Sequence, residues 1–183
     1  MQRRAERQNL KGIRQGQPQA CKLVVSEHYQ SIYNFMVYLT GDASLAEDLT
    51  QETFISAWAS ASGYKGRASI RTWLHKIAYN KVIDSRRRLR RHDALLARLQ
   101  QDGPNKSETS NPLQNLMVDE DSRFLYEAML RLNSSEYLLI VLHYIQGMSF
   151  REIAKVLDER VGTVKWRTSH SLKKLRAFLT GRI

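Results

Sequence analysis

The sequence predicts an all-α protein of two small helical domains joined by a flexible linker, with a helix-turn-helix in the second domain. Apolar residues recur at helical spacing through most of the chain, and no stretch alternates apolar and polar residues long enough to predict a strand. The 183 residues, 42% of them hydrophobic, can bury one modest core or two small ones. The string QQDGPNKSETSNPLQ concentrates Gly, Pro, Ser and Asn, which is typical of a linker.

These patterns divide the chain into four segments. A basic N-terminal arm is expected at 1–22, a first helical domain at 23–91, the linker at 92–118 and a second helical domain at 119–183. The residues of the arm do not indicate a function. The arm carries five cations: Arg3, Arg4, Arg7, Lys11 and Arg14.

The first domain begins with CKLVVSEHYQSIYNFMVYLTG, which predicts one helix or two, ending at Gly41. The next segment, DASLAEDLTQETFISAWASASG, predicts a helix whose start Asp42 or Ser44 would cap. Its core-facing stripe follows helical spacing and comprises Ala46, Leu49, Thr53, Phe54, Ala57 and Trp58.

A basic loop, SGYKGRAS, separates this helix from the string RTWLHKIAYNKVIDSRRRLRR at 71–91. Helical spacing places one apolar stripe on the second string, formed by Ile70, Trp73, Leu74, Ile77, Ala78 and Val82. Another face carries Lys76, Asn80, Asp84, Arg87 and Arg91. We therefore expect a helix that buries one side and offers the other to a partner.

The second domain contains two helices in DSRFLYEAMLRLN and SSEYLLIVLHYIQG, followed by a short third and a longer fourth. Ser149-x-x-Glu152 predicts a capping box at the start of the third helix. After a short turn, the fourth helix is expected to begin at Gly162-Thr163, which gives a helix-turn-helix. The second helix of such a unit enters the major groove through its N-terminal residues. The alternative is a helical hairpin with a solvated cationic face.

The net charge of +11 and the pI near 10.0 indicate a polyanionic partner, nucleic acid before membrane. The charge is unevenly distributed, because residues 42–61 sum to −4, residues 62–91 to +9 and residues 160–183 to +7. The acidic helix cannot face the same phosphates as its basic neighbour, so we expect its carboxylates to meet basic protein side chains. Simple solvation of an acidic surface is the alternative.

Other function classes find little support in the sequence. Cys21 is the one cysteine, so no internal disulfide can form. The chain has neither a membrane-spanning apolar run nor a signal-peptide pattern, so we expect a soluble, cytoplasmic protein without direct membrane insertion. No Walker A string occurs. No metal or cofactor site is expected, because the histidines are scattered: His28, His75, His92, His143 and His170.

Three strings together resemble bacterial sigma factors of the extracytoplasmic-function (ECF) group: AEDLTQETFISAW, GRASIRTWLHKIAYNKVIDSRRR and VGTVKWR. The resemblance covers about Leu23 to Arg91 as the family's region 2 and about Asp119 to Leu179 as its region 4. It implies an initiation subunit without catalytic residues, which joins core RNA polymerase, recognises promoter DNA and nucleates melting. The resemblance also implies an anti-sigma factor as a regulator.

The resemblance also implies roles for individual residues. The β-prime clamp coiled coil of the polymerase would dock on Glu47, Asp48, Gln51 and Glu52, and region 4 would meet the β flap. The minus-ten element, with one unstacked base, would be held by Tyr64, Lys65, Arg67, Lys76, Asn80, Asp84, Arg87 and Arg88. The minus-thirty-five element would be held by Thr163, Lys165, Trp166, Arg167, Ser169, His170 and Lys173.

The chain departs from the family at the recognition helix. Trp166 stands where family members usually have a small Ser, and His170 and Ser171 replace a common Arg-Ala pair. Trp166 would pack against thymine methyls, lie along the sugar-phosphate edge or turn into the core. Asp84 among arginines has two interpretations, a DNA contact or an ion-pair partner that orients Arg87 or Arg88.

Two other function classes compete with the sigma-factor interpretation. A site-specific recombinase would also combine basic helices with a helix-turn-helix, but it needs a reactive Ser or Tyr among clustered Arg, and the eight tyrosines lack that context. A stand-alone transcription regulator would bind duplex DNA tightly without polymerase.

Overall fold

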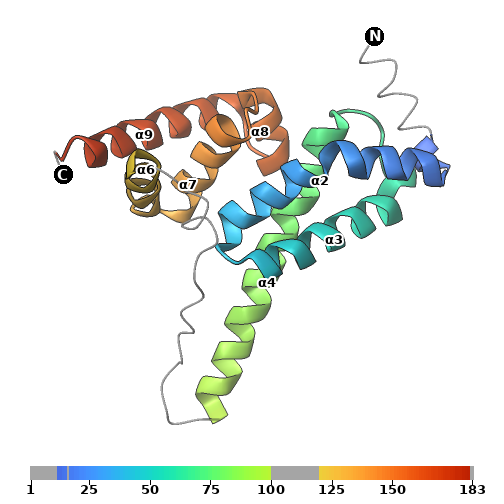
Figure 1. Ribbon diagram of the computed structural model, residues 1–183, viewed down its shortest axis with the longest axis horizontal. Coiled ribbons are helices and arrows are strands. Elements are labelled where there is room, and N and C mark those ends of the chain that lie inside the picture. Colours follow the sequence, from blue (N-terminus) through green and yellow to red (C-terminus); the bar gives the residue numbers. More distant parts are fainter. Residues whose placement is uncertain (1–11, 16, 100–119, 182–183) are drawn as a thin grey trace.

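The computed structural model describes residues 12–15, 17–99 and 120–181, and every regular element within these ranges is a helix (Figure 1). The all-α prediction is therefore confirmed. Most of the predicted linker and most of the N-terminal arm lie outside the described residues.

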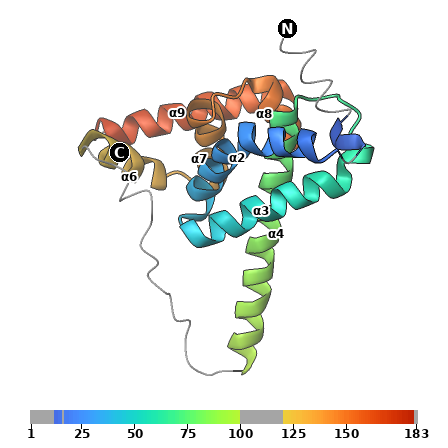
Figure 2. The same ribbon diagram turned by 45° about the vertical axis from the view of Figure 1, so that its right-hand side comes forward.

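The first group of helices comprises α2 (Pro18–Thr40), α3 (Ala43–Ser60), the 3-10 turn η1 (Ala61–Gly63) and α4 (Ile70–Leu99). α2, α3 and α4 pack against one another. The C-terminal half of α4 projects away from the other helices, as Figures 1 and 2 show from two directions. The helix continues past Arg91, where the sequence suggested that the domain ends.

Local sequence signals explain where these helices begin and end. Pro18 is the first residue of α2, a position whose backbone N–H would have no partner within the helix, so its absence in proline loses no hydrogen bond. Gly41 ends α2 with a φ of 70°, and its N–H donates to the Val37 carbonyl. The Asp42 carboxylate accepts from the Leu45 N–H at 3.0 Å, so Asp42 caps α3. Residues 21–40 are thus part of one helix, and Gly41 ends it as predicted.

The second group comprises α6 (Glu120–Leu130), α7 (Ser134–Ile140), the π turn η2 (Val141–Ile145), α8 (Phe150–Leu157) and α9 (Val161–Leu179). The predicted capping box of Ser149 and Glu152 starts α8. Asp158 ends it in the left-handed conformation, with φ at 55°. α9 packs on α6, α7 and α8, which confirms the helix-turn-helix.

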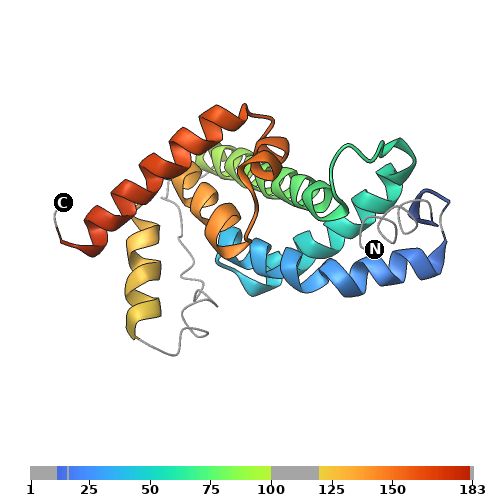
Figure 3. The same cartoon turned by 90° about the horizontal axis from the view of Figure 1, so that it is seen from above.

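The two groups lie directly against each other, because α8 packs on the N-terminal half of α4. A continuous apolar core runs through both and includes Phe35, Leu74, Leu139 and Ile153. Seen from above, α8 lies next to α4, while α9 extends away from the first group towards the C-terminus (Figure 3).

Candidate nucleic-acid interface

The outer face of α3 combines negative charge with exposed apolar side chains. Glu47, Asp48 and Gln51 are exposed, because the opposite face buries Ala46, Leu49, Thr53, Phe54 and Ala57 in the core. Ile55 and Trp58 follow them at helical spacing and are 61% and 39% exposed. Trp58 therefore does not belong to the buried stripe where its spacing placed it, and α3 offers a mixed acidic and apolar surface.

Glu52 differs from its acidic neighbours because it faces α4. Its Oε2 lies 3.2 Å from the Lys81 Nζ and 3.9 Å from a guanidinium nitrogen of Arg88. The side chain is half-buried. Glu52 thus joins the acidic helix to the basic helix, instead of lying on the outer face with Glu47 and Asp48.

The loop between η1 and α4 forms a shallow hollow of about 450 Å³. Tyr64 closes this loop: it is only 8% exposed, its hydroxyl donates to the Ala68 carbonyl, and its ring stacks on Trp73 with 4.4 Å between centroids. Lys65 and Arg67 are exposed at the rim. The aromatic pair gives the hollow an apolar wall beside two cations, although the Tyr64 ring is itself engaged.

The basic face of α4 carries the remaining candidates of the first domain. Asn80, Arg87 and Arg88 are exposed, and the Asp84 carboxylate lies 3.6 Å from the Arg87 guanidinium, an arrangement that the ion-pair interpretation expects. Lys76 forms an ion pair with the second group of helices: its Nζ lies 2.6 Å from the Asp158 carboxylate.

The exposed face of α9 gathers six of the seven candidates of the second domain. It carries Thr163, Lys165, Trp166, Ser169, His170 and Lys173. The opposite face buries Val164, Thr168, Ser171 and Leu175. Trp166 therefore points to solvent, which excludes the one of the three alternatives in which it turns into the core.

Arg167 is the seventh candidate and lies on the side of the helix. It is half-buried, forms an ion pair with Glu159 and donates to the Ser135 hydroxyl. One oxygen of Glu159 is buried without a further hydrogen bond among the described residues. Arg167 thus ties α9 to α7 and to the turn before α9.

Comparison with known proteins decides the family. The profile of Sigma-70 region 2 matches residues 24–92, and that of Sigma-70 region 4 matches residues 124–175. The chain is 31% identical over 163 residues to the ECF RNA polymerase sigma factor SigL of Mycobacterium tuberculosis, an alignment that covers 86% of this chain and 88% of SigL. The chain belongs to the ECF sigma factors. It is also 30% identical to the sigma factor YlaC of Bacillus subtilis, over 81% of this chain and 87% of YlaC.

Solved structures share the fold of this sigma factor. CnrH, in complex with the cytosolic domain of CnrY, matches with a TM-score of 0.72 at 23% identity, over 97% of this chain and 98% of that one. The sigma factor RpoE of Bartonella quintana, in complex with the anti-sigma factor NepR, matches with a TM-score of 0.69 at 21% identity, over 87% and 96% of the two chains. Membership of the family implies a non-catalytic transcription initiation factor.

A polar cluster joins the two sigma domains around Gln146, which follows the π turn. The Gln146 side chain accepts from the Ser31 hydroxyl at 3.0 Å and lies 3.3 Å from the His75 Nε2, while its carbonyl accepts from Arg71. Gln146 and His75 are both buried. The Lys155 Nζ also donates to the Arg67 carbonyl at 2.7 Å. Local sequence patterns do not predict this cluster, because it depends on contacts between distant segments.

Burial and hydrogen bonds set the protonation of groups at this junction. Burial lowers the pKa of His75, although hydrogen bonds to Arg71 and Gln146 act in the opposite direction, so the imidazole is held neutral. Burial alone would raise the pKa of Glu152, but hydrogen bonds from Ser149 and Thr72 lower it overall. Glu152 therefore stays ionised and accepts from the first domain.

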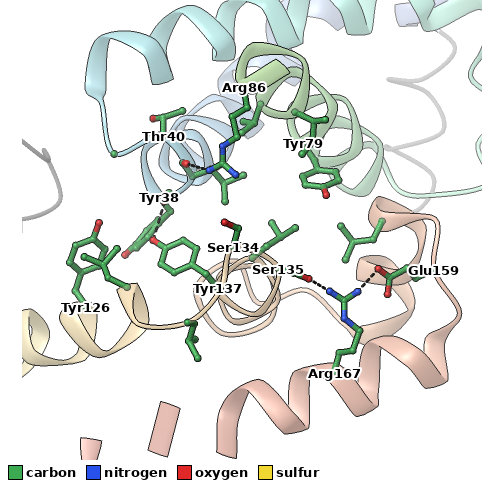
Figure 4. A pocket seen from close by; sticks show the side chains of 18 residues that line it. Tyr38, Thr40, Tyr79, Arg86, Tyr126, Ser134, Ser135, Tyr137, Glu159 and Arg167 are labelled. Carbon is green, nitrogen blue, oxygen red and sulfur yellow. Dashed lines mark hydrogen bonds and ion pairs between the residues drawn. The ribbon is translucent and has the colours of Figure 1, made fainter. Parts of the chain in front are cut away.

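A second junction surrounds a cavity of about 450 Å³ between the domains, shown in Figure 4. Arg86 donates to the Leu39 carbonyl at 2.7 Å at the end of α2, and the Tyr137 hydroxyl donates to the Tyr38 carbonyl at 3.0 Å. Burial raises the pKa of Tyr137, which keeps that hydroxyl protonated as a donor. Arg86, unlike Arg87 and Arg88, is thus a structural arginine.

The described residues contain no cluster of three or more His, Cys, Asp or Glu side chains with the spacing of a metal site. Over the same residues, no helix has the length and apolar composition needed to cross a bilayer.

Proposed function

We propose that this ECF sigma factor binds core RNA polymerase through α3, holds the minus-ten element with the 62–69 loop and α4, and binds the minus-thirty-five element with α9. The observation that carries the proposal is the separation of charge on one fold. The exposed carboxylates of α3, Glu47 and Asp48, lie on one helix, while the loop, α4 and α9 each present exposed cations of their own.

Core binding belongs to the face formed by Glu47, Asp48 and Gln51, extended by Ile55 and Trp58. Carboxylates steer the encounter with basic side chains of the β-prime clamp coiled coil, and apolar side chains contribute when they are desolvated at the centre of an interface. Glu52 contributes by positioning, because Lys81 already holds its carboxylate. The β flap is assigned to the second domain, as the family resemblance implies.

Promoter melting belongs to the loop and the adjacent basic face of α4. A single-stranded backbone would run along Arg87, Arg88 and Lys65, while the hollow beside Trp73 receives an unstacked base. Flipping a base costs a few kcal/mol, and stacking on an aromatic ring returns about 1 to 3 kcal/mol. Capture of the base therefore drives opening without ATP hydrolysis.

Promoter binding competes with the contacts between the two domains. Lys76 is paired with Asp158, and the Arg67 backbone accepts from Lys155, so α8 lies over part of the minus-ten surface. DNA contacts by Lys76 require that this pair separates. An anti-sigma factor, such as the partner of the RpoE structure, would act by holding the two domains away from polymerase and DNA.

The test is run-off transcription from genomic fragments with purified core RNA polymerase, with and without this protein. We expect discrete transcripts that depend on the protein, and their start points would reveal the promoter sequences. Absence of such transcripts, together with tight specific binding to duplex DNA without polymerase, would support the stand-alone regulator instead.

A further inference from the structure

The first turns of α9 present an indole to solvent. Trp166 is 68% exposed, and its ring stacks on the His170 imidazole, with 5.5 Å between ring centroids and 10° between ring planes. The other two tryptophans of the chain are less exposed, since Trp58 is 39% exposed and Trp73 is half-buried. An indole left in water forgoes the stabilisation that burial of its apolar surface would give. A ligand that covers it would recover that free energy.

The surroundings of the stacked pair indicate which ligand covers it. Lys165, Lys173 and Arg176 are exposed on the same helix, and residues 160–183 contain no acidic residue. The buried Val164 and Thr168 hold the other face of the helix against the domain. The ligand must therefore be anionic at its edges and apolar where it meets the ring. The DNA major groove has this chemistry, because phosphates border it and the C5-methyl of thymine is an apolar group exposed in it.

We propose that Trp166 is a specificity-determining residue that contacts thymine C5-methyl groups in the upstream promoter element, with His170 as the positioning residue that holds the indole flat. The inference rests on the proposed function and adds the base chemistry that this surface selects. Trp166 lies near the N-terminus of the second helix of the helix-turn-helix, which is the part that reaches base edges. The exposed indole offers apolar surface to the groove, so selection depends on the methyl group.

The experiment uses holoenzyme reconstituted from core polymerase and the full chain, on a promoter recovered from run-off transcription. Each thymine of the upstream element is replaced in turn by deoxyuridine, which lacks only the methyl group. We expect wild-type holoenzyme to lose about fourfold in promoter affinity at one or two positions, the loss that corresponds to one buried methyl-sized group. Trp166→Ala should bind the thymine promoter more weakly by a similar factor and should not respond to deoxyuridine at those positions.

Three further variants separate this contact from general weakening. Trp166→Phe retains a flat apolar ring and should keep the response to deoxyuridine. Lys173→Ala should weaken binding equally on thymine and deoxyuridine promoters, because a phosphate contact carries no base information. His170→Ala should reduce the response to deoxyuridine without changing the salt dependence of binding.

The proposal is overturned if wild-type holoenzyme is indifferent to deoxyuridine at every thymine, or if Trp166→Ala responds as the wild type does. Either result leaves the proposed function intact, provided that transcription still depends on the protein. Loss of the proposed function has a separate signature, which is the absence of any protein-dependent transcript from unmodified DNA.

Discussion

At the scale of single residues, Glu47 and Asp48 are the most direct test of core binding. Both are exposed on α3, next to Ile55. Glu47→Lys combined with Asp48→Lys should lower the affinity for core polymerase by at least about tenfold, because like charges across an interface cost several kcal/mol. Affinity for labelled core polymerase in solution measures the effect.

The matched control for that variant is Glu27→Lys combined with Glu127→Lys. These residues are exposed on α2 and α6, so the net charge changes equally but away from the acidic face. The control should bind core polymerase as the wild type does. An unchanged affinity in the Glu47 and Asp48 variant would remove α3 from the core interface.

His75 gives the fold a pH dependence. Its pKa in the folded protein is lowered by burial, so the folded state disfavours the proton that the unfolded state accepts near pH 6.5. The stabilising contribution is complete above that pH and is lost as the pH falls below it. We expect about 1 kcal/mol of unfolding free energy to be lost between pH 7.5 and pH 5.5 through this residue.

Urea unfolding of the wild type and of His75→Gln at the two pH values tests this expectation. The variant keeps a polar group beside Gln146 but cannot titrate, so its stability should change less with pH. The remaining histidines are common to both proteins. Equal pH dependence in the two proteins would mean that the imidazole is not held neutral.

At the scale of elements, the capping box of α8 fixes the start of the helix-turn-helix. The Ser149 hydroxyl accepts from the Glu152 N–H at 3.4 Å, and the Glu152 carboxylate accepts from the Ser149 N–H at 2.9 Å. Ser149→Ala should cost about 1 kcal/mol of unfolding free energy. Ser149→Asp retains a capping oxygen and should lie near the wild type in the same denaturant titration. If Ser149→Asp lost as much unfolding free energy as Ser149→Ala, the effect would not come from the helix cap.

Elements that depend on local pattern were predictable from the sequence. The buried stripe of α3, the Ser149 cap and the turn before α9 rest on neighbours within one or two helical turns. The continuation of α4 past Arg91 was missed because the apolar periodicity weakens after His92, although no glycine or proline marks a stop between Arg91 and Leu99.

The candidate site was predictable only in part, because helical spacing shows which side of a helix is exposed but not which distant residues meet. Helical spacing placed Glu47, Asp48 and the exposed face of α9 correctly at the surface. It could not foresee that Arg167 is paired with Glu159 or that Tyr64 packs on Trp73. The exposure of Ile55 could have been predicted, since this apolar residue falls outside the buried stripe of its helix. No pattern in the sequence predicts the contact between His75 and Gln146.

At the scale of the whole molecule, the contacts between α4 and α8 hold a closed arrangement. Gln146→Ala combined with Asp158→Asn removes the acceptor of Ser31 and the ion pair of Lys76. Loss of the buried hydrogen bonds should weaken closure by about 1 to 3 kcal/mol. We expect a larger radius of gyration in small-angle X-ray scattering and more transcript at limiting core polymerase.

The matched control is Gln30→Ala combined with Glu127→Gln, which makes similar changes at exposed positions on α2 and α6. It should scatter as the wild type does. If the interdomain variant is as compact as its control, the apolar core shared by both domains is sufficient to hold them together.

Glu52 has a consequence for how the two partners of the protein influence each other. Its carboxylate, on the acidic helix α3, lies near both Lys81 and Arg88 on the basic face of α4. A phosphate that draws Arg88 away leaves the Glu52 carboxylate with one cation fewer beside it, and a cation of the polymerase that draws Glu52 away leaves Arg88 more available to phosphate. Thermodynamic linkage makes these two effects equal in free energy. Polymerase and promoter strand would thus strengthen each other's binding through one carboxylate, without any movement of the backbone.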